Sequence, residues 1–380
     1  MKVQLKEVQA FRNSFELLFP DACLQDTARP FHSAITTAFH PTHDGTLLVA
    51  EDSGRSLSRV IAARPCEESF ACSHHWLDAF PESDGCIEVS TRGNLVEFHQ
   101  KNGSPERVLS LVGQTPSTNW ASPVMKAVDN RFVADLVTAS EYLKCNHAND
   151  VWKGIQLDGS RGTIAVESAG EIIGSHGHQF PWRQTVSIRA NDVFASLGIS
   201  KRDHVACGVF DLAFVVSAGP WRLRLPIEFW VPAIDIGAAK KKLGRISNRV
   251  QFDSKDLAFI LGHLKPYAKN VPAQQRVSLR LSDRIEVAIE EGYDLPPKRL
   301  VLSRSQQTGK PANIRMQSWH LRQVAKFGLT QLQWHGASQQ FSHADERLIY
   351  ICKSAPGIGG LKLPHDAIEI DSAAGSPVLA

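Results

Sequence analysis

The side chains best suited to metal binding are two pairs of histidines. His74 and His75 are adjacent, and His176 and His178 alternate as residues on one face of a strand do. Alternating imidazoles can bind zinc, but a zinc site needs further ligands at suitable spacing, and none is evident. The glycines beside the second pair favour an exposed loop. We therefore expect no metal site at either pair.

The residues best suited to acid and base catalysis are Glu290 and Glu291. They end an alternating stretch, RIEVAIEEGYD, which is typical of a solvated strand end and not of catalytic carboxylates. The glycine-rich residues 357–360 follow no βαβ pattern, and the chain contains neither a P-loop nor a nucleophile elbow. Seven scattered cysteines form no C-x-x-C pair. The sequence predicts no enzyme, no metal site and no cofactor.

Two tryptophans, Trp182 and Trp221, occur in the same Pro-Trp-Arg context at matching entries to strands. A tryptophan next to an arginine could stack on a nucleic-acid base. Burial at a sheet edge, with an arginine covering the ring, is the alternative, and we favour it.

Composition places the chain among globular proteins. Its 380 residues, 43% of them hydrophobic and 21% charged, suit two or three domains. No apolar run reaches the roughly 18 residues that span a bilayer, and the charged start MKVQLKEVQAF is typical of folded structure. We expect a cytoplasmic protein with no membrane partner. A net charge of +3 permits contact with nucleic acid without requiring it.

Three amphipathic helices recur at a fixed interval. They are predicted at Val8 to Phe19, at Phe132 to Cys145, and from Ser254 onward. Equivalent positions in the three helices lie 124 residues apart in both steps, which indicates an internal repeat. Each helix is followed by alternating strands that turn at short polar segments, namely residues 43–45, residues 158–162 and Asp283.

Each repeat then closes with a second strand–helix–strands series. The second helices are predicted at Trp76 to Phe80, Asp192 to Ile199 and Trp319 to Phe327. We place domain boundaries accordingly at residues 1–118, 119–245 and 246–355, with residues 239–249 as a polar linker. Residues 356–380 are rich in small residues and proline, and we predict a flexible C-terminal tail.

This order of elements resembles the bacterial sliding clamp, the DNA polymerase III beta subunit, over residues 1 to about 354. The best local matches are GTIAVESAGEIIG and the closing RLIYICKS. The resemblance, that of a diverged member, implies an α+β fold of three tandem repeats, each with two helices on antiparallel sheets. It also implies a head-to-tail homodimer that encircles duplex DNA without reading its sequence. Such a processivity factor tethers DNA polymerase or repair proteins during DNA replication.

The resemblance implies that the six helices line a channel and present cations to the DNA. The alternative is that these charges belong to ordinary solvated helix faces, since Glu16, Asp135, Glu141 and Asp192 share the same helices. The candidate DNA-binding residues are Arg12, Lys144, Lys201, Arg202, Lys265, Lys269, Arg322 and Lys326.

The resemblance also implies a groove for partner peptides between the second and third repeats. The stretch VESAGEII at residues 166–173 lacks the His-Arg pair that clamps carry there, and core packing explains its apolar residues equally well. The candidate groove residues are Val166, Gly170, Ile172, Ile173, Ile246, Val250, Ile349 and Ile351.

Three functions therefore remain. The first is a DNA-encircling clamp, and the second is a diverged clamp that binds proteins without being loaded on DNA. The third, which the residues favour least, is an enzyme of an unrelated α+β fold.

Overall fold

The computed structural model describes residues 1–20, 35–43, 45–52, 54–61, 66, 68–79, 85–92, 95–100, 106–109, 124–129, 131–145, 154–168, 170–197, 204–210, 212–228, 234–265, 276–290, 297–354 and 367–373. The chain divides into two units. Unit 1 comprises Met1–Ser140, Gly154–Gly162 and His178–Val231, and unit 2 comprises Glu141–Lys153, Thr163–Gly177 and Pro232–Ala380.

Unit 1 contains two main antiparallel sheets and the helices that cover them. One sheet has the strand order β1 (Lys2–Gln4), β6 (Cys86–Arg92), β7 (Leu95–Gln100), β8 (Glu106–Leu109). The other has the order β5 (Phe70–Ser73), β2 (Thr36–Thr42), β3 (Gly45–Asp52), β4 (Arg55–Ile61), β16 (Trp221–Pro226), β15 (Ala213–Ala218), β14 (Val205–Phe210), β9 (Lys126–Val128). A further pair joins β10 (Gly154–Asp158) to β13 (Thr185–Arg189). The helical segments are α1 (Leu5–Leu18), the 3-10 turn η1 (His74–Ala79), most of α3 (Arg131–Cys145) and α4 (Val193–Ser196).

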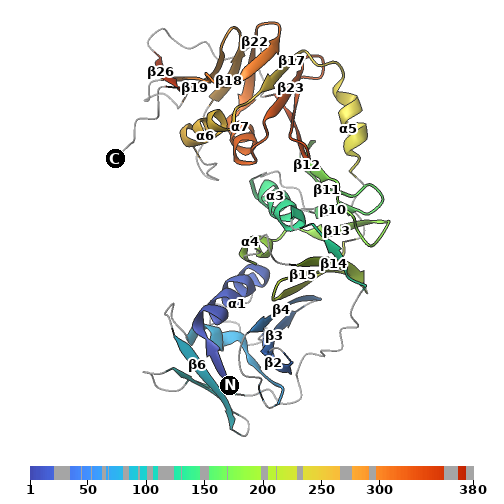
Figure 1. Ribbon diagram of the computed structural model, residues 1–380, viewed down its shortest axis with the longest axis vertical. Coiled ribbons are helices and arrows are strands. Elements are labelled where there is room, and N and C mark those ends of the chain that lie inside the picture. Colours follow the sequence, from blue (N-terminus) through green and yellow to red (C-terminus); the bar gives the residue numbers. More distant parts are fainter. Residues whose placement is uncertain are drawn as a thin grey trace, which may run out of the picture. The chain divides into compact units, whose positions relative to one another are not determined.

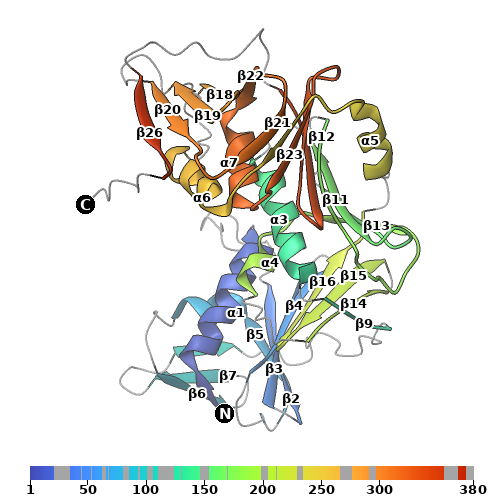
Figure 2. The ribbon, with the colours of Figure 1, turned by 45° about the horizontal axis from the view of Figure 1, so that its top comes forward.

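Unit 2 also contains two sheets. The first has the order β11 (Thr163–Ser168), β12 (Glu171–His176), β25 (Leu348–Lys353), β24 (Gln340–Ala344), β23 (Gln331–His335), β17 (Asn248–Gln251), β21 (Gln306–Gly309). The second has the order β22 (Ala312–Gln317), β18 (Arg276–Leu281), β19 (Ile285–Glu290), β20 (Lys298–Val301), β26 (Ile368–Asp371), and its edge at β26 is visible in Figure 2. Its helices are α5 (Ile236–Leu243), α6 (Ser254–His263) and α7 (Ser318–Lys326).

The predicted threefold repeat is confirmed. Each repeat runs strand, helix, three strands, then strand, helix, three strands, and the third repeat adds β21. Equivalent strands also pair alike: β1-β6-β7-β8, β9-β14-β15-β16 and β17-β23-β24-β25 follow one order. The hairpin turns lie where the polar segments predicted them, between β2 and β3, β10 and β11, and β18 and β19.

Successive repeats are joined by strand pairing. In unit 1, β4 of the first repeat pairs antiparallel with β16, the last strand of the second. In unit 2, β12 of the second repeat pairs antiparallel with β25, the last strand of the third. The same pair of equivalent strands therefore forms both seams, and each seam makes one continuous sheet from parts of two repeats.

The seam between β4 and β16 is sealed by Trp221. Its side chain is 3% exposed, and its ring is stacked on that of Phe11 in α1 at 6.4 Å between centroids. Arg59 of β4 places its guanidinium 4.4 Å from the same ring and forms an ion pair with Glu7 at 2.5 Å. Burial under an arginine is thus confirmed for Trp221, and Trp182 is buried as well, at 7% exposure.

Four predicted helices have the expected place and type: α1, α3, α6 and α7. The predicted helix at 76–80 is instead the 3-10 turn η1, because Pro81 cannot continue an α-helix. The predicted helix at 192–199 is the single turn α4, and Gly198 follows it in the sequence. None of the helices within the described residues is both long and apolar enough to cross a membrane.

The segment predicted as a polar linker, residues 239–249, begins inside helix α5. The Asp235 side chain caps the helix by accepting a hydrogen bond from the Ala238 N–H at 2.8 Å. Three lysines occupy the last turn, where cations interact favourably with the helix dipole, and Gly244 follows with φ of 77°.

The flexible-tail prediction for residues 356–380 is wrong at residues 368–371, which form β26. Ile368 to Asp371 pair parallel with Lys298 to Val301 of β20. The alternation Ile-Glu-Ile-Asp is a short strand pattern that the surrounding glycines and prolines obscured. The rest of that stretch lies outside the described residues, except for residues 367, 372 and 373.

The seam yields a stability prediction. Trp221→Ala removes the ring that packs on Phe11 and under Arg59, so we expect the free energy of unfolding of unit 1 to fall by about 3–5 kcal/mol. Urea unfolding followed by circular dichroism measures this loss. Arg222→Ala, a change at the neighbouring and partly exposed residue of the same strand, is the control. Equal effects of the two substitutions would contradict the role of the ring.

Candidate interaction surfaces

In each unit, two of the six helices predicted to line a channel lie side by side (Figure 1). In unit 1, α1 lies beside α4, and the hydroxyls of Ser14 and Ser196 are 2.9 Å apart. In unit 2, α6 lies beside α7, and Arg322 of α7 donates hydrogen bonds to the carbonyl oxygens of Leu261 and Leu264. These bonds satisfy carbonyls at the end of α6, so Arg322 caps a helix within its own unit.

Two further predicted DNA-binding cations have acidic partners in the folded chain. Arg12 forms an ion pair with Glu16 at 2.7 Å and also donates to the carbonyl oxygen of Leu77 at 3.4 Å. Lys326 forms an ion pair with Glu141 at 2.7 Å. Both pairs are partly exposed, so they are weak and could be exchanged for phosphate contacts at modest cost.

The other predicted cations are less closely defined. Lys265 is exposed and lies just after α6. Lys144 lies in α3, and its side chain is outside the described part of the structure. Lys201, Arg202 and Lys269 also lie outside the described residues. These positions stay predictions.

The exposed-loop prediction for the His-x-His pair is only partly right. His176 is exposed, but it is the last residue of strand β12. The His178 side chain is 3% exposed, and its Nε2 lies 3.0 Å from Oδ2 of Asp135 in α3. The rings of Phe132 and Phe180 lie within 6 Å of the imidazole, at 5.9 and 5.6 Å between centroids. Asp135 therefore faces inward and does not contribute to the solvated face of α3.

A basic surface that sequence reasoning missed lies on α5 and the start of β17. Between Ile236 and Phe252, all of them described residues, there is no Asp or Glu. The exposed cations of this basic segment are Lys240, Lys241, Lys242, Arg245 and Arg249. The run KKKLGR was visible in the sequence, but we interpreted it as a linker because its helix caps were overlooked.

An apolar cluster lies beneath α5 on one face of the β12–β25 seam. Ile172 is opposite Ile351 and Gly174 is opposite Ile349, so the apolar side chains of both strands project from the same face. All core members are at most 9% exposed. They are Ala165, Ile172, Ile234, Leu243, Ile349 and Ile351, with Ile236 and Ala239 packed against them.

Small residues in the strands allow α5 to lie close to the sheet. A Cβ atom at Gly174 would be 2.4 Å from Cδ1 of Ile236 and 3.2 Å from the carbonyl oxygen of Ile164. Ala165, opposite Gly174 in β11, contributes only a methyl group to the same face. The gap above these two residues is where Ile236 packs.

The predicted groove residues fall into three groups. Ile172, Ile349 and Ile351 belong to the apolar cluster. Val166 and Ile173 are paired with each other on the opposite face, because side chains alternate along a strand. Gly170 forms the β11–β12 turn with φ of 74°, and Ile246 and Val250 lie outside the cluster. The alternation therefore divides the predicted set between the two faces of the sheet. The groove itself stays a prediction.

The opposite face of the same seam carries a buried polar cluster. The Glu171 carboxylate receives a hydrogen bond from Nε2 of His320 in α7, at 2.8 Å to Oε1, and one from the Tyr350 hydroxyl at 3.3 Å. The Tyr350 ring is 5.6 Å from that of Tyr142 and 6.0 Å from that of His343. Neither ring nitrogen of His343 has a hydrogen-bond partner among the described residues.

Burial controls the protonation of this cluster. It lowers the pKa of His343 to about 3, with a smaller contribution from the charge of His320. Burial likewise raises the pKa of Tyr350 and of the Cys352 thiol well above their usual values. His320, His343, Tyr350 and Cys352 are fully buried. We interpret the cluster as a packing element that fixes α7 on the sheet.

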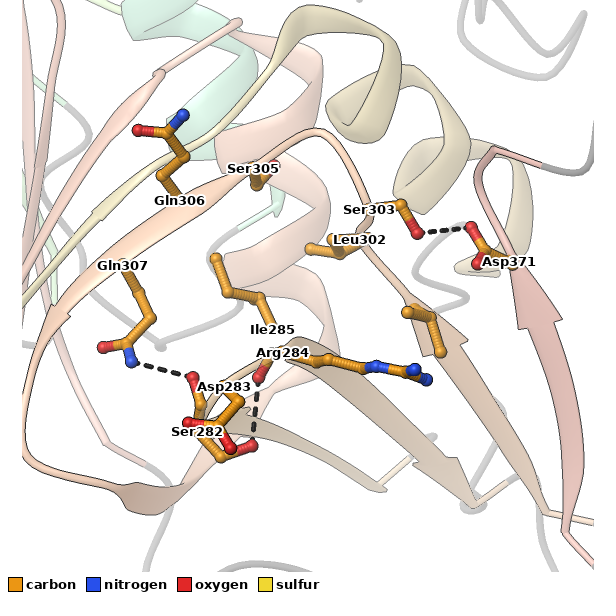
Figure 3. A pocket seen from close by; sticks show the side chains of 11 residues that line it. Ser282, Asp283, Arg284, Ile285, Leu302, Ser303, Ser305, Gln306, Gln307 and Asp371 are labelled. Carbon is orange, nitrogen blue, oxygen red and sulfur yellow. Dashed lines mark hydrogen bonds between the residues drawn. The ribbon is translucent and has the colours of Figure 1, made fainter.

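A pocket of about 640 Å³ opens at the turn between β18 and β19, beside β26 (Figure 3). The turn residues Ser282, Asp283 and Arg284 form one wall, and Ser303 and Asp371 form another. A hydrogen bond from Ser303, reinforced by the Ala373 N–H, lowers the pKa of Asp371. The carboxylate is thus committed to holding the end of β26 in place.

Solved structures of bacterial sliding clamps cover 94% of the chain. The DNA polymerase sliding clamp from Bacillus subtilis is 10% identical, with 98% of its own chain covered and a TM-score of 0.69. The DNA polymerase III subunit beta from Pseudomonas aeruginosa is 11% identical, with 100% covered and a TM-score of 0.66. The H. pylori beta clamp in complex with 5-chloroisatin is 10% identical, with 100% covered and a TM-score of 0.67.

No protein-family model and no curated protein matches the sequence. The match in structure covers nearly the whole of both chains, so the chain has the α+β fold of the sliding clamps, with its three repeats. The expected resemblance is confirmed at the level of the fold.

Gly174→Val tests how α5 is held. The added side chain overlaps Ile236, so we expect unfolding to become easier by about 1–3 kcal/mol and the amides of α5 to exchange faster with deuterium. Ile236→Ala in the same background vacates the space, so the effects of the two substitutions should be non-additive. Unchanged exchange of the α5 amides in Gly174→Val would rule out this packing.

The buried His343 predicts a pH dependence of stability. Below its usual pKa of 6.5 the imidazole binds a proton in the unfolded chain, but the folded chain binds one only near pH 3. The free energy of unfolding should therefore fall as the pH falls through this window, by up to about 1.4 kcal/mol per pH unit. Urea unfolding at several pH values should show a shallower slope for His343→Leu. An identical slope in both proteins would mean that His343 is not the group responsible.

Proposed function

We propose that this sliding-clamp fold serves as a non-catalytic ring around duplex DNA that tethers replication or repair proteins. The proposal is supported above all by the repeated seam. Equivalent strands join the first repeat to the second and the second to the third, and the two seams are built alike. A structure that repeats one joint in one direction closes into a ring when the last unit meets the first.

The unpaired end of this series lies at β8. Its counterparts β16 and β25 each pair with two strands, whereas β8, within the described residues, pairs only with β7. We propose that β8 completes its pairing with a second copy of the chain, which gives a head-to-tail homodimer. The three domains of each chain, at residues 1–118, 119–245 and 246–355, would then give six domains around the ring.

Contact with DNA in such a ring depends on cations and not on base recognition. The helix pairs α1 with α4 and α6 with α7 supply part of the proposed lining. Lys265 is exposed for this role, and Lys144, Lys201, Arg202 and Lys269 are proposed for it by position. Arg12, Arg322 and Lys326 would first have to give up the internal partners described above.

Tethering of partner proteins is proposed at the apolar cluster. A peptide with bulky apolar residues would pack beside α5 against the half-buried Ile236 and Ala239, which cover Ile172, Ile349 and Ile351. Such a protein would act in the cytoplasm on replicating or damaged DNA.

A second function, protein binding without DNA loading, is favoured by one observation. Three of the predicted channel cations are held by groups of their own unit, which reduces the charge available to DNA. The same apolar cluster would then bind a regulatory partner. Absence of DNA binding at every salt concentration would support this function over the ring.

Retention on circular DNA separates the two functions. A closed ring should stay on nicked circular duplex DNA through a high-salt wash, because a topological link does not depend on ionic contacts. Cutting the circle with a restriction enzyme should release the protein from the free ends. The measurement is the amount of protein that co-elutes with DNA before and after cutting, at protein concentrations of about 10 μM or more so that dimers form. Complete loss in the high-salt wash, before cutting, would contradict encirclement.

A further inference from the structure

Strand β26 covers the outer edge of β20 and ends the second sheet of unit 2. Lys298 is opposite Ile368 and Val301 is opposite Asp371, and the two strands run parallel. The N–H of Ile368 donates to the carbonyl oxygen of Pro297 at 3.0 Å. The N–H of Ser372 donates to the carbonyl oxygen of Val301 at 3.0 Å. The backbone groups on this edge of β20 are thus engaged by the end of the same chain.

The internal repeat shows what this edge corresponds to. β20 occupies in the third repeat the position of β4 in the first and β12 in the second. β4 is covered by β16 and β12 by β25, in both cases by the last strand of the following repeat and in both cases antiparallel. Within the described residues no further repeat follows the third, and the β20 edge is covered instead by a parallel strand from outside the repeat pattern.

We infer that the β20 edge is the surface that pairs with β8 of a second copy, and that β26 occupies it until the second copy displaces it. The inference rests on the proposed ring and adds that the C-terminal strand controls its closure. β8 fits because it is the equivalent of β16 and β25, the strands that cover β4 and β12. An antiparallel β8 and a parallel β26 would use the same backbone groups of β20, so only one can be present.

The hydrophobic contribution to the free energy that holds β26 on β20 is small. Ile368 is 45% exposed, Glu369 is exposed, and Ile370 and Asp371 are only partly covered. A four-residue strand with so little buried apolar area gains little from the hydrophobic effect. Water can replace most of its contacts when it leaves, which suits a strand that must be displaced.

Polar contacts fix the register of β26. The Ser303 hydroxyl donates to Asp371 at 2.5 Å, and Arg304 donates to the carbonyl oxygen of Ser372 at 2.6 Å (Figure 3 shows the first of these). Arg299 of β20 lies 3.5 Å from Glu369. Such partly exposed contacts specify where the strand lies and contribute little free energy. They make β26 a specific but weak occupant of the edge.

Sedimentation equilibrium of the full chain and of a chain that lacks residues 356–380 tests the inference. We expect removal of the tail to lower the dimer dissociation constant at least about tenfold. Equal dissociation constants would overturn control by β26 and leave the ring intact. Two chains that both stay monomeric up to about 100 μM would overturn the ring itself, and the inference with it.

Point variants give a matched test that keeps the tail. Ile368→Pro removes the N–H that donates to the carbonyl oxygen of Pro297, the residue before β20, so it should free the edge and strengthen dimerisation as the deletion does. Glu369→Pro is the matched control. The N–H of Glu369 points away from β20, because successive N–H groups along a strand point to opposite sides, so this variant should leave the dimer dissociation constant unchanged. Identical behaviour of the two variants would refute the strand exchange.

A synthetic peptide of residues 365–375 identifies the contested surface directly. Added to the truncated dimer, it should pair with β20 and return the protein to monomers, while the same peptide with Ile368→Pro should not. If neither peptide weakens the dimer at saturating concentration, the second copy does not use the β20 edge.

Discussion

The hydrogen-bonding groups along a strand edge are the constraint on which this structure depends. An edge strand presents a row of N–H and C=O groups that must be paired or solvated, and it offers a template to any strand of matching length. Here the fourth strand of each repeat presents such an edge, and each has a different partner: β16 for β4, β25 for β12, and β26 for β20. The same local geometry thus supports a joint between repeats and a contact with the chain's own terminus.

The β12–β25 seam shows how one joint serves two purposes. Alternation sends Ile172, Ile349 and Ile351 to one face, where the absence of side-chain bulk at Gly174 admits α5. It sends Glu171 and Tyr350 to the other, where they hold His320 of α7. The polar side holds α7 in position, whereas the apolar side is covered by α5.

Much of the fold could be predicted because it is local and repeated. The 124-residue interval located α1, α3 and α6, and short polar segments located the hairpins between alternating strands. The predicted DNA-binding and groove residues were harder, because they depend on which way a side chain points. Arg12 has the right charge and the right helix, but Glu16 one turn later pairs with it. Val166 and Ile173 are as apolar as Ile172, yet a one-residue step moves them to the other face.

The features that sequence reasoning missed share a different cause. Asp235 and Gly244 were both visible as cap residues of α5, but the lysine run between them suggested a solvated linker. The alternation of apolar and acidic residues at 368–371 spans only four residues, which is too short to identify a strand unless the partner strand is known. His178 was assigned to solvent because its partner, Asp135, lies 43 residues earlier in the chain. In each case the deciding contact is non-local.

We propose that identical joints close the chain into a ring with a second copy. Electron microscopy of the truncated dimer lacking residues 356–380 tests this proposal, because class averages show the outline of single particles. We expect closed rings with a central opening and six similar segments around the circumference. Dimers that are open, or that are compact without a central opening, would contradict it.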